Sequence, residues 1–291
     1  MFYHSINGEF TTASDLATGP RDRGLAYGHG LFESIGYHSG QLPHKLRHMQ
    51  RLCADALVLG IELDPATISA YLDDFLVQLA AAGVDEGVVK LVATAGSGGR
   101  GYQSPAAMTP LIICQHAEFD FEQARLQRQQ GIKLWRCNHR LPINPPLAGI
   151  KHLNRLDQVL ARSEWTSADY ADGLMLSPQG SVIEATAANL FALTENGWVT
   201  PRLDDSGVAG VMRALLMDEI FPNTATAVSI EPIALGQLEQ ASEIFICNSL
   251  RGIIPVTQLG ESDSAAVVSK DIGEQTKMLQ SALVQQYSCY L

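Results

Sequence analysis

The sequence contains no long hydrophobic run, few cysteines and comparatively few charged side chains, which make up 18% of its 291 residues. No apolar stretch approaches the roughly 20 residues that a membrane-spanning helix requires. The N-terminal residues, Met1 to Ser5, lack the basic patch and apolar core of a secretory signal. We therefore expect a cytoplasmic protein that does not act at a membrane.

The cysteines are odd in number, scattered and never spaced as Cys-x-x-Cys; they are Cys53, Cys114, Cys137, Cys247 and Cys289. This pattern is typical of reduced thiols in the cytosol and argues against a disulfide framework or a zinc site. His44 and His48 lie four residues apart, as two metal ligands on a helix would, but no acidic third ligand accompanies them. We expect no metal site.

Positive charge is also scarce. The chain has 20 Lys and Arg against 31 Asp and Glu, which gives a net charge of −11 and a pI near 5.1. A general nucleic-acid binder would carry the opposite sign, because phosphate neutralisation dominates such affinities. If this acidic protein binds small anions, it must gather cations locally, so arginines and helix N-termini are the places to search.

The hydrophobic content of 46% is ample for a core, and the length fits one large domain or two ordinary ones. Asn7-Gly8 predicts a hairpin turn between residues 2–6 and 9–11. A helix over 44–59 would place Leu46, Met49, Leu52, Cys53 and Leu57 on its apolar face. Asp64 as cap, Pro65 in the first turn and Gly83 after the end predict a second helix. Strands are predicted at 32–37, 88–94 and 111–114.

Residues 118–130 are polar and charged, and we expect them to join two halves, residues 1–117 and residues 131–291. In the second half we predict strands at 132–136, 173–176, 182–184, 198–200, 243–247 and 253–256. Helices are predicted after residue 155, from about 211 to 220, and from 270 to 288. The sequence shows no internal repeat and no low-complexity tract.

One segment stands out: Gly149-Ile150-Lys151-His152-Leu153-Asn154-Arg155-Leu156. A Pro-rich loop, residues 141–146, leads into it, and Leu156, Val159, Leu160 and Ser163 follow at helical spacing. If the amine of Lys151 is buried, its pKa falls and it becomes a nucleophile or base. On physical grounds alone, the plainer interpretation of a solvated lysine is favoured.

The segment resembles the lysine segment of aminodeoxychorismate lyases. These belong to the fold-type IV pyridoxal-phosphate enzymes, together with branched-chain and D-amino-acid aminotransferases. The resemblance implies an α/β (α+β) fold with a smaller N-terminal α/β domain, a larger C-terminal α/β domain with a pseudo-barrel, and the cofactor between them. It implies that Lys151 binds pyridoxal 5′-phosphate covalently and then acts as the catalytic base. Relatives are homodimers, so a homodimer is expected.

Further segments match the family in order along the chain. Arg51, in His48-Met49-Gln50-Arg51-Leu52, corresponds to an arginine that contacts the cofactor phosphate. Glu184 and Asn189 match the motif E-x-x-x-x-N, in which the glutamate faces the protonated pyridine nitrogen; an arginine partner for Glu184 is the alternative. The helix start after Gly210 nominates the backbone of Val211 and Met212 as phosphate ligands. Ser249 matches a family position that also contacts the phosphate.

Two glycine-rich segments resemble the family's substrate side. Residues 95–102 follow a strand but lack Gly-Lys-Ser/Thr and precede another strand, which excludes a nucleotide loop. The resemblance makes Arg100 a carboxylate clamp and places Tyr102 beside it, although an ordinary surface loop stays open for Tyr102. His29 lies in the other segment, residues 21–34. The alternative interpretation of this segment is an ordinary turn into a strand. His29, His152 and Asn154 are candidates for guiding a second proton transfer, and packing roles are as well supported for each.

The resemblance thus implies a lyase that converts 4-amino-4-deoxychorismate, a small anionic amine, to 4-aminobenzoate and pyruvate, a step towards folate. The sequences Lys-His-Leu-Asn-Arg and Ser-Gly-Gly-Arg-Gly-Tyr favour the lyases, whereas Glu33 is shared with aminotransferases. One alternative is an aminotransferase for a branched-chain or D-amino acid. Another is a catalytically silent relative that binds only the cofactor or another protein.

Overall fold

A computed structural model describes residues 3–12, 18–99, 101–105, 108–224, 226–260 and 268–291. The chain forms two compact units. Unit 1 comprises Met1–Asp120 together with Lys151–Asn154, and unit 2 comprises Phe121–Ile150 with Arg155–Leu291. The predicted domain division at 117 and 131 stays a prediction. Within the expected connecting segment, residues 121–130 form a helix, α4 (Phe121–Gln130), which packs on unit 2.

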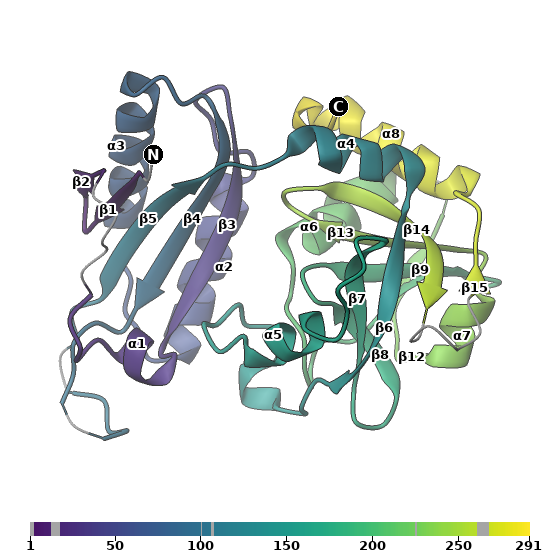
Figure 1. Ribbon diagram of the computed structural model, residues 1–291, viewed down its shortest axis with the longest axis horizontal. Helices are drawn as coiled ribbons and strands as arrows, with labels where there is room; N and C mark the ends of the chain where they lie inside the picture. The colour runs from purple at the N-terminus through teal and green to yellow at the C-terminus, as the bar shows by residue number, and fades with distance from the viewer. Residues whose placement is uncertain (1–2, 13–17, 100, 106–107, 225, 261–267) are drawn as a thin grey trace. The chain divides into compact units, whose positions relative to one another are not determined.

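Unit 1 is built on a five-stranded antiparallel sheet in the order β2-β1-β5-β4-β3 (Figure 1). The strands are β1 (His4–Ile6), β2 (Glu9–Thr11), β3 (Gly30–His38), β4 (Glu86–Thr94) and β5 (Leu111–Ala117). Asn7 and Gly8 both adopt left-handed backbone angles, φ 48° and 88°, which two-residue hairpin turns require. The predicted hairpin is confirmed, and β3 lies at the edge of the sheet.

Helices α2 (Lys45–Val58) and α3 (Pro65–Ala81) pack against this sheet. The signals predicted for α3 are confirmed: the Asp64 carboxylate accepts the N–H groups of Ala66 and Thr67, and Gly83 is left-handed just after the end. The predicted apolar face of α2 is wrong in part. Leu46 and Leu57 are exposed, because the buried face instead runs through His48, Met49, Leu52 and Ala56.

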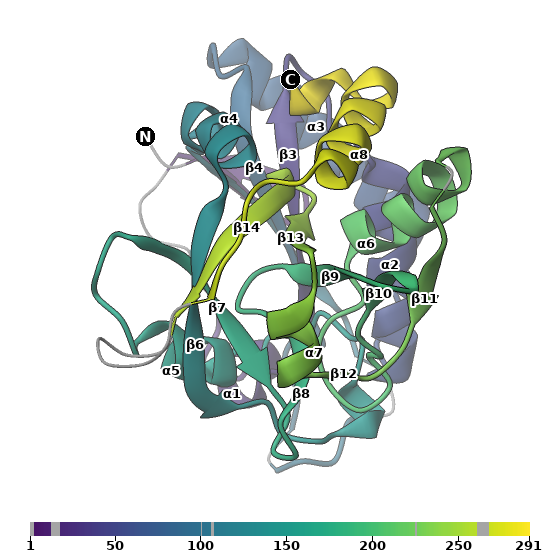
Figure 2. The same ribbon diagram turned by 90° about the vertical axis from the view of Figure 1, so that its right-hand side faces the viewer.

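Unit 2 is built on a ten-stranded mixed sheet that curves into a half-barrel (Figure 2). Its strands run in the order β11-β10-β9-β13-β14-β6-β7-β8-β12, and β15 pairs with β14. They are β6 (Ile132–Arg140), β7 (Tyr170–Leu176), β8 (Ser181–Ala185), β9 (Asn189–Thr194), β10 (Gly197–Thr200), β11 (Val228–Ile230), β12 (Ile233–Ala234), β13 (Glu243–Asn248), β14 (Gly252–Gly260) and β15 (Val268–Ser269). The parallel pairs are β10 with β11, β14 with β6, and β6 with β7.

Helices cover the face of this sheet that carries Phe191, Trp198 and Phe245. Helix α6 (Val211–Leu215) continues as a π-helical turn, Leu216–Ile220, so the helix predicted towards Ile220 is confirmed. Its apolar residues pack with Phe191, Trp198 and Phe245 and with helix α8 (Glu274–Gln286). Helices α4 and α8 both lie on β14, and the Gln280 amide on α8 donates to the Arg128 carbonyl on α4 at 2.8 Å.

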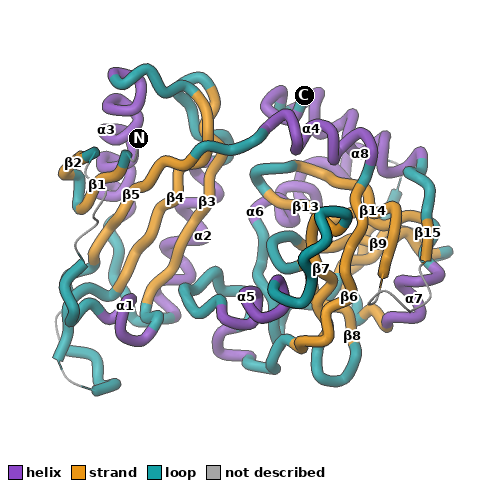
Figure 3. The backbone as a smooth tube through the Cα atoms, viewed as in Figure 1, coloured by secondary structure: helices purple, strands orange, loops and turns teal. Residues whose placement is uncertain are grey.

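Several short elements were not predicted, namely α1 (Arg23–Tyr27), α7 (Leu235–Gln240) and β15 (Figure 3), and β11 and β12 (Figure 2). Helix α1 has a local basis that is visible afterwards: Asp22 caps it by accepting the Leu25 N–H, and Gly28 ends it with φ 66°. Among the residues that the structure describes, no helix is long and apolar enough to cross a membrane. The described part of the chain also contains no group of three or more His, Cys, Asp or Glu that could hold a metal ion.

Candidate active site

The segment that carries Lys151 pairs with the free edge of β3 through an isolated β-bridge. The Phe32 N–H donates to the Lys151 carbonyl at 3.1 Å, the Leu153 N–H donates to the Gly30 carbonyl at 2.9 Å, and His152 lies opposite Leu31. An edge strand has unpaired backbone groups and can accept such an addition. The sheet of unit 1 therefore fixes the backbone of this lysine.

Both the side chain and the N–H of Lys151 have defined surroundings. Its Nζ lies 4.2 Å from the centroid of the Phe32 ring, and its backbone N–H donates to Oδ2 of Asp55 at 3.1 Å. Lys151 is half-buried. This geometry favours a lysine with a specific position over the solvated lysine that physical grounds alone had favoured.

Beneath this lysine, a buried cluster connects β3 to α2. The Glu33 carboxylate accepts Nδ1–H of His48 at 2.6 Å and Nε–H of Arg51 at 2.8 Å, and it also pairs with Nη2 of Arg51. Burial by itself would raise the pKa of Glu33, but the His48 hydrogen bond and the Arg51 charge outweigh it and hold the pKa below its usual range. Arg51 is thus oriented by an ionised carboxylate; its contact with a phosphate stays a prediction.

Histidine 48 contributes as a neutral group. Burial lowers the pKa of His48, and the nearby Arg51 and Lys151 charges lower it further, although Glu33 acts in the opposite direction. His48 lies on the buried face of α2 together with Arg51 and Asp55, spaced three and four residues apart. The His48 ring is engaged with Glu33, so it is not available to pair with His44 as a metal ligand.

The predicted substrate side of unit 1 is organised by Arg23, which sequence reasoning passed over. Its buried guanidinium donates to the carbonyls of Gly101, Tyr102 and Gln103 at 3.0–3.5 Å. Its Nε–H donates to Nδ1 of His29, so Nε2–H of that ring is the donor to the Leu59 carbonyl at 2.8 Å.

Tyr102 and His29, two of the three residues predicted to meet the substrate, are thus joined through Arg23. The Tyr102 ring itself is 86% exposed and lies 5.4 Å from the ring of Tyr27. The third residue, Arg100, lies outside the described residues. The sequence signal that Arg23 could have given is a basic residue inside a glycine segment of an acidic chain.

In unit 2, Glu184 and Asn189 form a hydrogen bond with each other; their contacts with the cofactor stay a prediction. Glu184 is buried at the end region of β8, and its Oε2 accepts the Val208 N–H at 2.8 Å and the Asn189 amide at 3.4 Å. The Asn189 side chain also donates to the Val208 carbonyl at 2.8 Å and accepts the Gly210 N–H at 3.1 Å. The motif therefore fixes the loop that leads into α6.

The alternative of an arginine partner for Glu184 also has support. Burial lowers the pKa of the Arg155 guanidinium, and the charge of Glu184 acts on it in the opposite direction, which requires the two groups to be near each other. Arg155 follows Lys151 by four residues and is the residue before α5 (Leu156–Arg162). A buried carboxylate with a cation in reach can still face a further positive group.

Backbone hydrogen bonds also join the loop at Val208 to Gly149, which begins the lysine segment. The Gly149 N–H donates to the Gly207 carbonyl at 3.0 Å, and the Ala209 N–H donates to the Gly149 carbonyl at 2.9 Å. Gly207 has φ +87°, and a Cβ there would come within 3 Å of Leu203 and Ile183. Only Ile150 separates Gly149 from Lys151 in the sequence.

The predicted phosphate-binding residues Val211, Met212 and Ser249 lie at two turns of unit 2. Val211 and Met212 open α6, whose preceding residue, Gly210, supplies no side-chain cap. The Arg213 side chain is turned to Thr200 and Pro201, with contacts of 3.1 Å. Ser249 follows β13, and its carbonyl accepts the Tyr290 hydroxyl at 2.9 Å.

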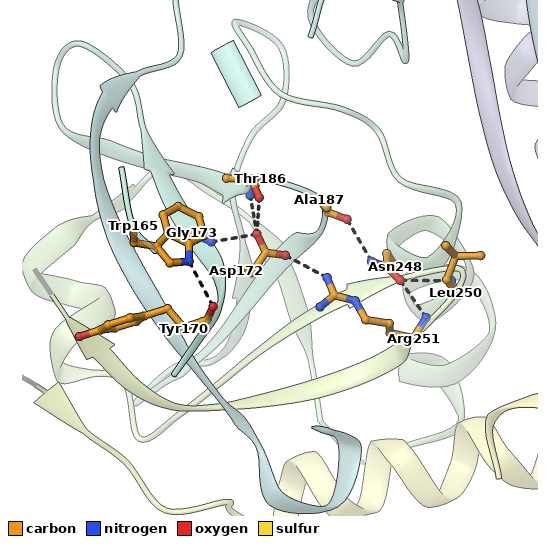
Figure 4. A network of polar contacts seen from close by, with 9 residues as sticks. All are labelled: Trp165, Tyr170, Asp172, Gly173, Thr186, Ala187, Asn248, Leu250 and Arg251. Carbon is orange, nitrogen blue, oxygen red and sulfur yellow. Dashed lines mark hydrogen bonds and ion pairs between the residues drawn. The ribbon is translucent and has the colours of Figure 1, made fainter. Parts of the chain in front are cut away.

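A buried network that sequence analysis did not predict holds the turn at Ser249 (Figure 4). Asp172 accepts the N–H groups of Gly173 and Thr186 and the Thr186 hydroxyl, at 2.5–3.0 Å, and pairs with Nη2 of Arg251 at 2.9 Å. Asn248 accepts the N–H groups of Leu250 and Arg251 and donates to the Ala187 carbonyl at 3.0 Å. The network therefore fixes residues 186–187 and 248–251 against each other.

Residues 30–259 match the family model of amino-transferase class IV, and they include the lysine segment, the glutamate motif and the turn at Ser249. The chain belongs to this family. The fold-type IV architecture predicted from the sequence is confirmed, because class IV proteins of known structure superpose on almost all of the chain.

Among class IV relatives, the aminodeoxychorismate lyase of Vibrio harveyi is 35% identical over 263 residues, which cover 90% of this chain and 94% of the relative. The crystal structure of 4-amino-4-deoxychorismate lyase from Pseudomonas aeruginosa matches with a TM-score of 0.86 and 39% identity, covering 98% of this chain and 99% of that one. A hypothetical aminotransferase from Mycobacterium tuberculosis, solved in a PLP-bound form, shares the fold at 17% identity, with a TM-score of 0.80 and coverage of 98% and 99%.

The cofactor of the class IV family is pyridoxal 5′-phosphate, and the groups present suit it. A specifically held lysine amine suits an aldehyde, a buried carboxylate suits a protonated pyridine nitrogen, and an arginine and uncapped helix amides suit a phosphate. Unit 1 contains such groups at Lys151 and Arg51, and unit 2 contains them at Glu184 and at the start of α6.

Proposed function

We propose that this class IV protein is a PLP-dependent lyase that converts 4-amino-4-deoxychorismate to 4-aminobenzoate and pyruvate. The observation that carries the proposal is its similarity to two such lyases over at least nine-tenths of the chain, at 35% and 39% identity. The fold by itself would not separate a lyase from an aminotransferase, because both use the same cofactor residues.

Lys151 is the residue that we propose for covalent attachment of the cofactor and for proton transfer. Once the substrate amine has displaced Lys151 from the cofactor, the Nζ of Lys151 accepts the proton from the substrate carbon that bears nitrogen. When bound, pyridoxal phosphate supplies an electron sink for the pair left on that carbon. The bond between the ring and the ether oxygen of the side chain would then break, which makes the ring aromatic, and the departing enolate would take up the proton held by Lys151 to become pyruvate.

Other residues bind and tune. Glu184, supported by Asn189, accepts a hydrogen bond from the protonated pyridine nitrogen and so keeps that nitrogen charged. We propose Arg51, Ser249 and the backbone N–H groups of Val211 and Met212 for the phosphate. Arg100, Tyr102 and His29 are proposed for the carboxylates and ring of the small anionic substrate.

The decisive experiment supplies the purified protein with PLP and 4-amino-4-deoxychorismate but no keto acid. A lyase releases pyruvate and 4-aminobenzoate over many turnovers, whereas an aminotransferase stops after one half-reaction. Turnover that requires an added keto acid would replace the proposal with the aminotransferase alternative. A protein that stays colourless with PLP would instead point to a silent relative that binds another protein and not the cofactor.

Lys151→Ala tests the assignment of the lysine. It should abolish turnover and the adduct that borohydride traps on the protein. Lys90→Ala is the matched control, because Lys90 also lies over the Phe32 ring, at 5.2 Å, but is exposed on β4. It should retain both activity and adduct. Retention of the adduct in the Lys151 variant would remove Lys151 from its role.

We also propose that the protein is a cytoplasmic homodimer. Support for a dimer comes from α5, where Leu156, Val159 and Leu160 occupy one side at helical spacing and are 74%, 57% and 55% exposed. Three adjacent apolar side chains of this size on one helix are typical of an interface. All five cysteines are free thiols, which is consistent with a reducing compartment.

A further inference from the structure

We propose that Asp55 is a positioning residue for Lys151: its carboxylate holds the lysine backbone and ties it to the helix that carries Arg51. This rests on the proposed role of Lys151.

The backbone hydrogen bonds between β3 and the Lys151 segment are interrupted at Lys151. Lys151 lies opposite Phe32 and accepts the Phe32 N–H, as a hydrogen-bonded antiparallel pair would. In a regular pair the two residues exchange both bonds, so the Lys151 N–H would return to the Phe32 carbonyl. It donates instead to Oδ2 of Asp55 at 3.1 Å. The Asp55 side chain on α2 thus replaces one backbone acceptor at Lys151, the first residue of the segment that pairs with β3.

The Asp55 carboxylate gains from the same hydrogen bond. Asp55 is half-buried, and burial raises its pKa, while the Lys151 N–H and the charge of Arg51 act in the opposite direction. A carboxylate withdrawn from water is unfavourable unless it accepts hydrogen bonds. The Lys151 N–H supplies one, so the contact satisfies two half-buried polar groups at once.

Helix α2 carries Asp55 and Arg51 on the same face. Asp55 follows Arg51 by four residues and His48 by seven, so the three side chains lie on one face of α2. Glu33 fixes Arg51 and His48 to β3, and Asp55 fixes Lys151 to the same face. The position of the lysine is therefore coupled to that of the proposed phosphate-binding arginine.

The contact with Asp55 restricts the position of the Lys151 Nζ, which matters for the proposed chemistry. The proposed reaction needs this amine to reach the cofactor aldehyde and later a carbon-bound proton, and a displacement of about 1 Å can cost roughly 100-fold in rate. Asp55 does not touch the reacting atoms. It removes freedom from the backbone on which the reacting amine is carried.

The test compares Asp55→Ala, which removes the acceptor, with Asp55→Asn, which removes the charge but keeps an acceptor oxygen. Amide hydrogen exchange at Lys151 in the apoenzyme should become about tenfold faster in Asp55→Ala and stay near wild type in Asp55→Asn. Borohydride trapping after addition of PLP should be about tenfold slower in Asp55→Ala, and kcat should fall with little change in KM. Asp73→Ala is the control, because Asp73 is exposed on α3 and pairs with Lys45.

If Asp55→Ala does not fold, Asp55→Ser provides the same comparison, because its hydroxyl ends one bond short of the carboxylate oxygens. Unchanged exchange at Lys151 in Asp55→Ala or Asp55→Ser would overturn the proposal. So would an Asn variant that behaves like Ala, since charge rather than the acceptor would then matter. Exchange in the apoenzyme does not depend on any substrate, so failure of the lyase assay would leave this comparison decisive on its own.

Discussion

Arg51 and Glu33 form a two-point ion pair inside unit 1, in which Nε donates to Oε1 at 2.8 Å and Nη2 donates to Oε2. The carboxylate is almost fully buried. Such a pair fixes the plane of the guanidinium, so the donors not facing Glu33 have a defined direction. The proposed phosphate contact of Arg51 thus depends on a residue of the neighbouring strand.

Glu33→Gln should therefore weaken both stability and cofactor binding. Removing one partner of a buried pair leaves the other charge uncompensated, which costs about 3–5 kcal/mol. We expect a loss of this order in urea unfolding of the apoenzyme and a PLP affinity lowered by about tenfold or more. Glu122→Gln, which breaks the exposed pair with Arg125, should change neither. Wild-type PLP affinity in Glu33→Gln would separate Arg51 from the phosphate.

The stability should fall as the pH falls from neutral, in part through His48. Burial lowers the pKa of His48 from 6.5, so the folded protein keeps the ring neutral where the unfolded chain binds a proton. The unfolded state then binds more protons below about pH 6.5, and the stability decreases in that direction, by at most about 1.4 kcal/mol per pH unit for one group. The lowered pKa of Glu33 acts with the same sign, but only below its ordinary 4.5.

His48→Asn retains a donor near the position of Nδ1 and removes the titration. Urea unfolding at pH 7.5 and pH 5.5 should show a smaller decrease in the variant than in the wild type. The raised pKa of Asp55 changes the stability in the opposite direction. The folded protein binds this proton more tightly than the unfolded chain does, so above pH 3.8 this group favours the folded state as the pH falls. Equal decreases in the two proteins would show that His48 does not contribute.

Asp172→Asn should destabilise unit 2 and loosen the turn that carries Ser249. The substitution removes the buried ion pair with Arg251 and places an amide where four donors converge. We expect a loss of roughly 3 kcal/mol in unfolding and a faster release of PLP, measured by its absorbance. Glu274→Gln, whose pair with Lys277 is exposed, is the control. Unchanged PLP release would mean that the turn holds its shape without Asp172.

Arg23→Lys should free the loop at residues 101–103. Lysine cannot reproduce the planar fork that donates to three consecutive carbonyls and to His29. We expect faster cleavage of this loop in limited proteolysis and a KM raised about tenfold with a smaller change in kcat. Arg21→Lys is matched in charge and exposed, and it should behave as wild type. A KM that does not change would detach the loop from the substrate.

Val159→Glu should convert the proposed dimer to a monomer, because it places a charge in the centre of the exposed apolar side of α5. Light scattering after size exclusion measures the mass directly. Val77→Glu introduces the same charge at an exposed position of α3 and should leave the mass unchanged. A monomeric wild type, or a dimeric Val159 variant, would remove α5 from the interface.

Local signals predicted those features whose cause lies within a few residues. The left-handed turn at Asn7-Gly8 and the cap and stop of α3 at Asp64 and Gly83 depend on neighbouring backbone alone. The family motif nominated Glu184 and Asn189 for the cofactor from a spacing of five residues, but their mutual hydrogen bond was not predicted.

Only the tertiary structure decided the remaining features. Asp172 meets Arg251 across 79 residues, and Asp55 meets the Lys151 backbone across 96, so no periodicity could indicate either contact. The apolar face predicted for α2 included Leu46 and Leu57, but His48 and Arg51 pair with Glu33 on β3, and those two leucines are left exposed. The sequence by itself determined turns, caps and the identity of the reactive lysine candidate. Which backbone and side chains hold that lysine depended on strand pairing between distant segments, because such pairing is set by the path of the whole chain.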